Sequence, residues 1–190
     1  MIEYEAKFLE IDKKKVRTRL ASAGAVLVRP EFVQKRVVLD LPDPEKSKQS
    51  WLRVRDEGDK ITLSFKTVDG AKIENQKEVS VVVTDFDTTV SLLQAIGCKK
   101  KGYQVTKREL WKISAAEITI DEWPFLPPFV EIEASSEDEV KMLAEKLGFD
   151  YSKAVFGASD VVYSMRYGVP PKALDAFPEL TFEMKNPFLS

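Results

Sequence analysis

The chain has 190 residues, of which 44% are hydrophobic and 32% are charged, a composition typical of one globular domain with a sizeable core. Its formal net charge of -2 gives no overall attraction to nucleic acid or to a membrane surface. No apolar run approaches the roughly 20 residues of a membrane span, and the N-terminus lacks a signal-peptide pattern. We therefore expect a cytoplasmic protein, monomeric or homodimeric, with neither nucleic acid nor a membrane as a partner.

Histidine is absent from the sequence, and Cys98 is the only cysteine. This excludes His-based catalytic triads, imidazole general bases, the usual zinc sites and an intrachain disulfide. Carboxylates, lysines, arginines, tyrosines and hydroxyls remain for chemistry. Sites built from carboxylates alone suit hard cations such as Mg²⁺, Mn²⁺ or Ca²⁺.

Segments with the alternation typical of strands dominate the first 134 residues. The eight predicted strands cover about residues 1–8, 26–41, 51–56, 60–66, 73–83, 99–113, 117–121 and 130–134. The second is interrupted near Pro30. The turn Glu57-Gly58-Asp59 joins the third and fourth strands into a hairpin.

Three helices are predicted between these strands, each beginning at a capping residue and ending at a glycine. They cover about residues 12–23, 85–97 and 136–148. From residue 151 onward the pattern weakens, and we expect a helix over 159–167 and a last strand over 180–184.

This order predicts an α+β fold with a closed or nearly closed eight-stranded antiparallel barrel and short helices packed outside. We assign residues 1–168 to this domain and residues 169–190 to a tail that packs on the barrel or extends it. Each strand has one apolar face and one charged face, so the apolar faces could meet the helices while the charged faces line the lumen. A sandwich with its charged face in water is the alternative.

The charges on these faces are sorted by sign, which favours the inward arrangement. The acids are concentrated at Glu3, Glu5, Asp121, Glu131 and Glu133. The bases are concentrated at Lys7, Arg53, Arg55, Lys66 and Arg108.

An inward group of acids needs cations between its members, because two carboxylates about 4 Å apart repel by about 4 kcal/mol at an effective dielectric near 20. Mg²⁺ usually shares its coordination positions among carboxylates, waters and substrate phosphates. Protonated lysines and arginines would donate hydrogen bonds to a polyanion bound there. Acids, metal and bases together therefore predict a site for a chain of phosphates.

The motif Glu3-x-Glu5-x-Lys7 resembles the N-terminal ExExK signature of the CYTH domains, the triphosphate tunnel metalloenzymes. This superfamily includes class IV adenylyl cyclases, thiamine triphosphatases and inorganic triphosphatases. The companion motifs follow in family order across most of residues 1–165, and they are Leu52-Arg53-Val54-Arg55, Lys66, Glu78, Arg108, Asp121 and Glu131-x-Glu133.

The resemblance implies an eight-stranded tunnel that binds a linear triphosphate, or a nucleotide, in its lumen. It implies that one or two Mg²⁺ or Mn²⁺ ions are held by Glu3, Glu5, Asp121, Glu131 and Glu133. It implies substrate contacts by Lys7, Arg53, Arg55, Lys66, Glu78, Arg108 and Lys153. Of these, Lys7 and Arg55 are expected to act in catalysis.

The sequence departs from the family pattern in the strand that contains Arg108. Many members have Lys-x-Arg where this chain has Thr106-x-Arg108, so one phosphate contact is missing or is supplied by Lys107 through a shifted register. Trp51-Leu52-Arg53 and Thr106-Lys107-Arg108 look somewhat like the thiamine-triphosphatase branch.

The function that the resemblance implies is metal-dependent hydrolysis of inorganic tripolyphosphate or of an organic triphosphate. One alternative is a class IV adenylyl cyclase that converts ATP to cyclic AMP and pyrophosphate. Another is a barrel that binds polyphosphate or a nucleotide without catalysis.

Overall fold

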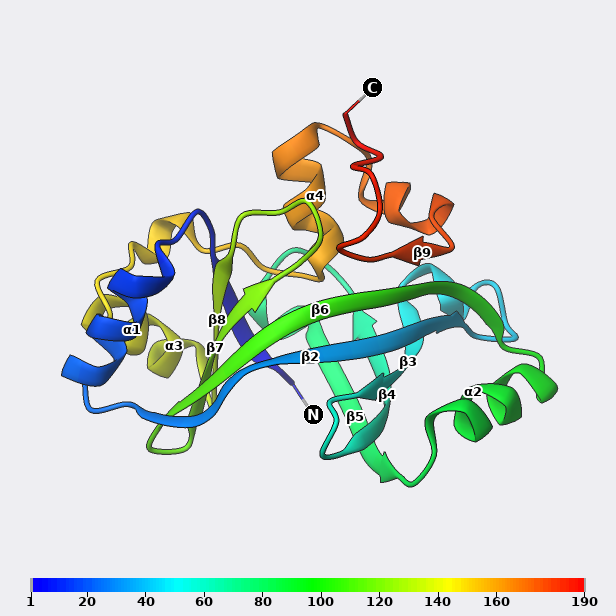
Figure 1. Ribbon diagram of the computed structural model, residues 1–190, viewed down its shortest axis with the longest axis horizontal. Helices are drawn as coiled ribbons and strands as arrows, with labels where there is room; N and C mark the ends of the chain where they lie inside the picture. Colours follow the sequence, from blue (N-terminus) through cyan, green and yellow to red (C-terminus); the bar gives the residue numbers. More distant parts are fainter. Residues whose placement is uncertain (1, 190) are drawn as a thin grey trace.

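The computed structural model describes residues 2–189, with the backbone alone described at residues 172 and 175. Its centre is an antiparallel sheet with the strand order β1-β8-β7-β6-β2-β3-β4-β5 (Figure 1). The strands are β1 (Tyr4–Phe8), β2 (Val26–Asp40), β3 (Ser50–Asp56), β4 (Ile61–Val68), β5 (Gln76–Val83), β6 (Lys99–Ile113), β7 (Ala116–Glu122) and β8 (Phe129–Ala134). Each of the eight predicted strands is therefore present.

Strands β2 and β6 are the longest, with 15 residues each, and their pairing joins the two halves of the sheet. The register between them shifts on both sides of Arg29, next to Pro30. Proline has no N–H group to donate to the ladder, which explains the irregularity at this point. The predicted interruption near Pro30 is thus a shift of register within one continuous strand.

The sheet curls until its edge strands β1 and β5 approach each other, but the described residues do not form a continuous ladder between them. One isolated bridge joins Ile2 to Lys77, and the Glu3 N–H donates to the Gln76 carbonyl at 2.9 Å. We predicted that β5 begins at Ile73, whereas Ile73–Asn75 forms the 3₁₀ helix η2 and buries Ile73 in the core. Of the predicted closed or nearly closed barrel, the structure therefore shows an antiparallel curled half-barrel, without a ladder that closes it among the described residues.

Helices α1 (Lys13–Ser22) and α3 (Glu137–Lys146) cover the outer side of β1, β7 and β8 (Figure 1). The Asp12 carboxylate caps α1, and the Ser136 hydroxyl accepts from the Glu139 N–H at the start of α3. Helix α2 (Phe86–Ala95) packs Phe86 and Leu93 against the other half of the sheet. All three predicted helices are present, and they bury the apolar outer face of the strands.

The C-terminal part of the chain joins the same sheet. Helix α4 (Ser159–Tyr167) is followed by β9 (Glu179–Leu180), which pairs in parallel with β6 at Tyr103 and Gln104. Strand β7 pairs with β6 only at residues 107–113, so β9 occupies the place beside β6 that β7 leaves free. The predicted strand over 180–184 was wrong in its extent, because the chain turns after Leu180. The division of the chain at Gly168 stays a prediction.

The remaining 3₁₀ helices are η1 (Lys46–Lys48), η3 (Tyr151–Lys153) and η4 (Pro171–Ala176). None of the helices within residues 2–189 has the length and apolar character needed to cross a bilayer.

Candidate active site

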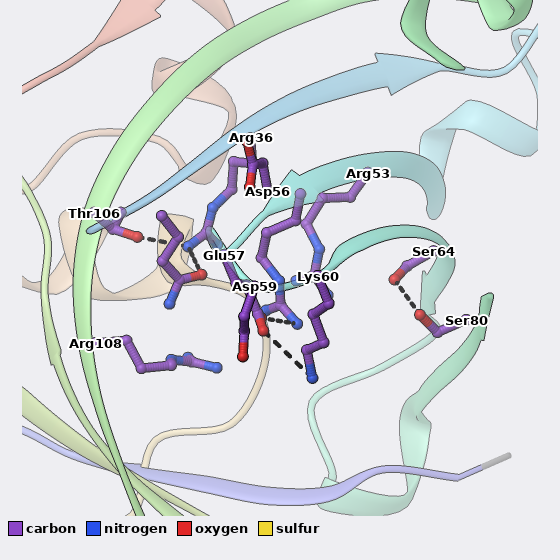
Figure 2. Close-up of polar contacts among 12 residues, drawn as sticks. Arg36, Arg53, Asp56, Glu57, Asp59, Lys60, Ser64, Ser80, Thr106 and Arg108 are labelled. Atoms are coloured by element: carbon purple, nitrogen blue, oxygen red, sulfur yellow. Dashed lines mark hydrogen bonds and ion pairs between the residues drawn. The ribbon is translucent and has the colours of Figure 1, made fainter. Parts of the chain in front are cut away.

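The strands sort their side chains between the two faces of the curled sheet. Ala6, Phe8 and Ile132 belong to the core under α1 and α3. Successive side chains of a strand point to opposite faces, so the charged residues between them lie on the inner, concave face. Arg36, Arg53 and Arg108 project into the space on this face from β2, β3 and β6 (Figure 2).

Lys7 and Arg108 compensate the acids on the β1 side of the concave face. The Lys7 ammonium pairs with Glu5, lies 3.3 Å from a Glu131 oxygen, and donates to the Gly157 carbonyl at 2.8 Å. The Arg108 guanidinium donates to both Asp121 oxygens at 2.7 Å and to Glu131 at 2.6 Å. Although burial opposes the charged form, Lys7 and Arg108 hold the pKa of Glu131 well below its usual value.

Lys66 and Arg53 compensate the acids on the β5 side. The Lys66 ammonium lies 3.0 Å from Glu3 of the β1 edge and 2.6 Å from Glu78 of β5, so it connects the two edges of the sheet. Arg53 lies 3.2 Å from Glu78. Burial, together with the neighbouring Glu78 and Glu5, raises the pKa of Glu3 despite the Lys66 ammonium.

Arg55 pairs with Glu57, a buried acid that sequence reasoning assigned only to the hairpin turn. The two side chains approach to 2.8 Å, and Lys60 lies 3.3 Å from the second Glu57 oxygen. Burial and the nearby Arg53 and Arg108 lower the pKa of Arg55 to about 10. Arg55 is thus held on the concave face close to other cations.

Arg36 of β2 is a buried base that the sequence analysis missed. It is 5% exposed and donates to the Thr106 hydroxyl at 2.6 Å and to the Gln34 side-chain oxygen at 3.1 Å (Figure 2). Its guanidinium lies 4.6 Å from the centre of the Trp123 ring. The alternation of Gln34 and Arg36 with buried Val37 and Leu39 was the signal that could have found it.

Several buried polar atoms of this face lack a hydrogen-bond partner among the described residues. They include Gln34 Nε2, Arg36 Nε, Arg53 Nε, Arg55 Nε and Thr62 Oγ1. Buried donors are normally satisfied by a protein group, a water or a ligand. An anion with several oxygens is a ligand that can accept from many of them at once.

The carboxylates predicted as metal ligands mostly pair with bases. Glu133 is different, because in the strand ladders it lies between Glu5 of β1 and Glu117 of β7. Partial burial and the nearby Glu5 and Glu117 carboxylates raise the pKa of Glu133, which remains exposed to solvent, to about 7. Within residues 2–189, no three metal-ligating side chains are already arranged around one ion position. A hard divalent cation nevertheless fits these residues, because their ligand atoms are all oxygens and because a cation would relieve the carboxylate repulsion that helps to raise the pKa of Glu133.

Two predicted bases lie away from the concave face. Lys107 lies 3.7 Å from Glu122 and 5.0 Å from the Phe182 ring, so no shifted register brings it to the place of the missing contact. The Lys153 side chain is 80% exposed and lies 3.9 Å from Asp150. The backbone at Val155 and Gly157, and not the Lys153 side chain, is what this segment places beside Lys7.

Comparison with known proteins agrees with this geometry. A family model described as the CYTH domain matches residues 1–162. A protein of Methanocaldococcus jannaschii named "Putative adenylate cyclase MJ0240" is 27% identical over 142 residues, which cover 73% of this chain and 79% of that protein.

Two solved structures show the same fold. A Vibrio parahaemolyticus protein, described as a "putative adenylate cyclase", has a TM-score of 0.76 at 13% identity and covers 86% of this chain and 98% of its own. A Hippeastrum protein, described as a "Putative adenylyl cyclase" with a dominant triphosphatase activity, has a TM-score of 0.56 at 14% identity. The match covers 90% of this chain and 99% of that protein. The family match contains all eight strands of the curled sheet and the charges of its concave face. The chain therefore belongs to the CYTH family.

Proposed function

We propose that this protein is a metal-dependent triphosphatase that hydrolyses inorganic tripolyphosphate or an organic triphosphate bound along the concave face. The observation that carries the proposal is the concentration of bases there together with buried N–H groups that lack an acceptor. A linear triphosphate is a row of anionic oxygens that can accept from such groups. CYTH members are known as adenylyl cyclases and triphosphatases, which places a triphosphate among the substrates of the family.

In this proposal the bases bind and orient the phosphate chain. Arg53, Arg55 and Lys66 come from adjacent strands, so their positions are fixed by the sheet before the substrate arrives. Their charges neutralise the negative charge that develops on the leaving phosphate in the transition state. Lys7 is held by Glu5, Glu131 and the Gly157 carbonyl, and it would contact the substrate from the β1 side.

The carboxylates would hold the metal. Glu3, Glu5, Asp121, Glu131 and Glu133 are the proposed ligands of Mg²⁺ or Mn²⁺. When bound, such an ion binds phosphate oxygens and acidifies a water molecule. Binding it would also relieve the repulsion that raises the pKa of Glu133. The chain needs no histidine base in this scheme.

An adenylyl cyclase is the second candidate, favoured by the name of the Methanocaldococcus relative. In that reaction the ribose 3′ oxygen of ATP attacks the α-phosphorus and pyrophosphate leaves. The same row of bases would serve both reactions, and they differ in where the nucleoside lies. A third candidate, a barrel that binds the triphosphate without turnover, differs from both in its kinetics.

A substrate panel separates these candidates. Tripolyphosphate, ATP and thiamine triphosphate should each be incubated with Mg²⁺ and with Mn²⁺, and the products identified. We expect release of inorganic phosphate. Cyclic AMP with pyrophosphate would favour the cyclase, and ligand-induced thermal stabilisation without turnover would favour the binding barrel.

A matched pair of variants tests the role of the concave face. Arg55→Gln should lower kcat by about 10²- to 10³-fold, the loss typical when one group that stabilises transition-state charge is removed. Lys35→Gln also removes one positive charge, but Lys35 of β2 lies on the outer face of the sheet, 3.3 Å from Asp56, so this variant should leave kcat unchanged. Equal activity of the two variants would contradict the proposed site.

A further inference from the structure

Arg36 differs from the other concave-face arginines in forming no ion pair with an acid of residues 2–189, and only the more distant Asp121 offsets its charge. Arg108 pairs with Asp121, Arg53 with Glu78, and Arg55 with Glu57. No carboxylate of the described residues lies within ion-pairing distance of Arg36. Its two acceptors are the neutral side chains of Gln34 and Thr106.

The surroundings of Arg36 are dry and positive. Gln34 and Thr106 are fully buried, and the Trp123 ring lies against the guanidinium. Burial, and then the nearby cations of Arg53, Arg55 and Arg108, lower the pKa of Arg36 well below its usual value. A buried cation without an anion is costly, and the cost rises when other cations are close. Folding alone gives no reason for this arrangement.

Two buried donors of this cluster are free to bind something. Arg36 Nε and Gln34 Nε2 have no acceptor among residues 2–189, and both belong to side chains that are at least nine-tenths buried. The Thr106 hydroxyl accepts from Arg36 and so fixes one edge of the guanidinium. A guanidinium held in this way matches the oxygens of a phosphate better than a flexible ammonium would.

We propose that Gln34, Arg36 and Thr106 form a further phosphoryl-binding subsite of the concave face. Arg36 and Gln34 donate to the oxygens of a phosphoryl group at one end of the phosphate chain, while Thr106 positions Arg36. Trp123 lies behind the subsite in an apolar cluster with Tyr163 and Leu180, and all three side chains are buried, so they leave no accessible surface for a sugar or a base. An organic group of the substrate would therefore lie at the other end of the chain. This inference rests on the proposed function for the identity of the anion.

The test compares Arg36→Gln with Lys35→Gln, which removes the same charge from the neighbouring residue on the opposite face of β2. Binding of tripolyphosphate is measured by calorimetry in a chelating buffer, so that no turnover occurs. We expect Arg36→Gln to bind about tenfold or more weakly than the wild type, the loss typical of a charge-assisted hydrogen bond. Lys35→Gln should bind like the wild type.

Thermal melts guard against a purely structural effect. If Arg36 only supports the fold, Arg36→Gln melts at a lower temperature without ligand, and tripolyphosphate then raises all melting temperatures equally. Our proposal predicts that tripolyphosphate raises the melting temperature of Arg36→Gln less than that of Lys35→Gln. Arg36→Lys should lie between them, because an ammonium keeps the charge but cannot reach Thr106 and a phosphate in one plane.

The outcomes separate this inference from the proposed function. Wild-type affinity for tripolyphosphate in Arg36→Gln overturns the subsite and leaves the triphosphatase proposal standing. If the wild type binds no tripolyphosphate in chelating buffer and releases no phosphate from it with Mg²⁺ or Mn²⁺, the triphosphatase proposal fails, and inorganic phosphate becomes the probe. A melting-temperature gain with phosphate in the wild type that Arg36→Gln lacks would still support the subsite. No gain with either anion overturns both.

Discussion

Most bases of the concave face pair with a nearby acid, and Arg36 is the exception. Arg108 is the clearest case of this pairing, because its Nε and Nη2 groups donate to the buried Asp121 carboxylate and to the largely buried Glu131 carboxylate. Asp121 is only 1% exposed and also accepts from the Thr119 hydroxyl at 2.8 Å. Removing the cation leaves these negative charges in a dry environment, where they are most costly.

Arg108→Met should therefore lower the free energy of unfolding by about 3–5 kcal/mol in metal-free buffer at pH 7. Urea denaturation measures the change. The loss should shrink as the pH falls, because protonation of Asp121 and Glu131 removes the charges that Arg108 compensates. Lys107→Met is the matched control on the outer face. Its ion pair with Glu122 is partly exposed, so its loss should cost less than about 1 kcal/mol. A similar loss in both variants would contradict this account.

The site could be predicted from the sequence wherever alternation in a strand coincided with a charged residue in a recognisable motif. Lys7, Arg53, Arg55, Lys66 and Arg108 were found in this way. Arg36 was missed because it belongs to none of these motifs and has only neutral hydrogen-bond acceptors among the described residues. The Lys153 side chain lies away from the concave face because a 3₁₀ turn decides where it points, and strand periodicity carries no information about such turns. Its role in substrate binding stays a prediction.

At the scale of elements, the C-terminal segment depends on aromatic packing more than on strand pairing. β9 has two residues, whereas the Phe188 ring lies 4.9 Å from the Tyr167 ring and 5.3 Å from the Phe177 ring. The Tyr163 ring lies 5.1 Å from the Phe188 ring, and the Tyr163 hydroxyl donates to the Pro124 carbonyl at 2.6 Å. These contacts hold the end of the chain against α4 and the loop after β7.

Phe188→Ala should destabilise the protein by about 2 kcal/mol, less than the full cost of emptying a core position because Phe188 is only partly buried. The free energy of unfolding measured in urea checks this value. Leu189→Ala is the control, since Leu189 is 73% exposed and should change stability by less than about 0.5 kcal/mol. A Phe188→Ala variant as stable as this control would show that the tail is not held by its aromatic contacts.

The elements of residues 1–150 were predictable because caps and glycines mark their helices and alternation marks their strands. The last strand was not, because two residues are too few for a period to appear. Its pairing with β6 depends instead on where β7 ends, which is a property of the assembled sheet. The extent of β5 was overestimated for a related reason, since Ile73 has strand composition but packs as part of a 3₁₀ turn.

At the scale of the whole molecule, the two halves of the sheet meet along a weak seam between β1 and β5. The backbone contacts between these edges are the Ile2–Lys77 bridge and the Glu3 N–H donating to the Gln76 carbonyl. The Gln76 side chain also donates to the Glu5 carbonyl at 3.1 Å. Lys66 adds a charged link between Glu3 and Glu78. The bases on the concave face repel one another, and burial strengthens this repulsion. The repulsion therefore acts against the contacts that hold β1 and β5 together.

A bound polyanion should therefore tighten the seam. Neutralising the bases removes the repulsion, so tripolyphosphate should slow amide hydrogen exchange in peptides covering residues 2–8 and 76–83. Exchange in residues 86–95 of α2, which packs on the outer face, should not change. Hydrogen–deuterium exchange with mass spectrometry measures both, and Arg55→Gln, which binds the anion less well, should show less protection at the seam under the same conditions. Protection that appears in α2 but not in β1 and β5 would mean that the anion binds outside the concave face. That result would contradict the prediction that a bound polyanion tightens the seam between β1 and β5.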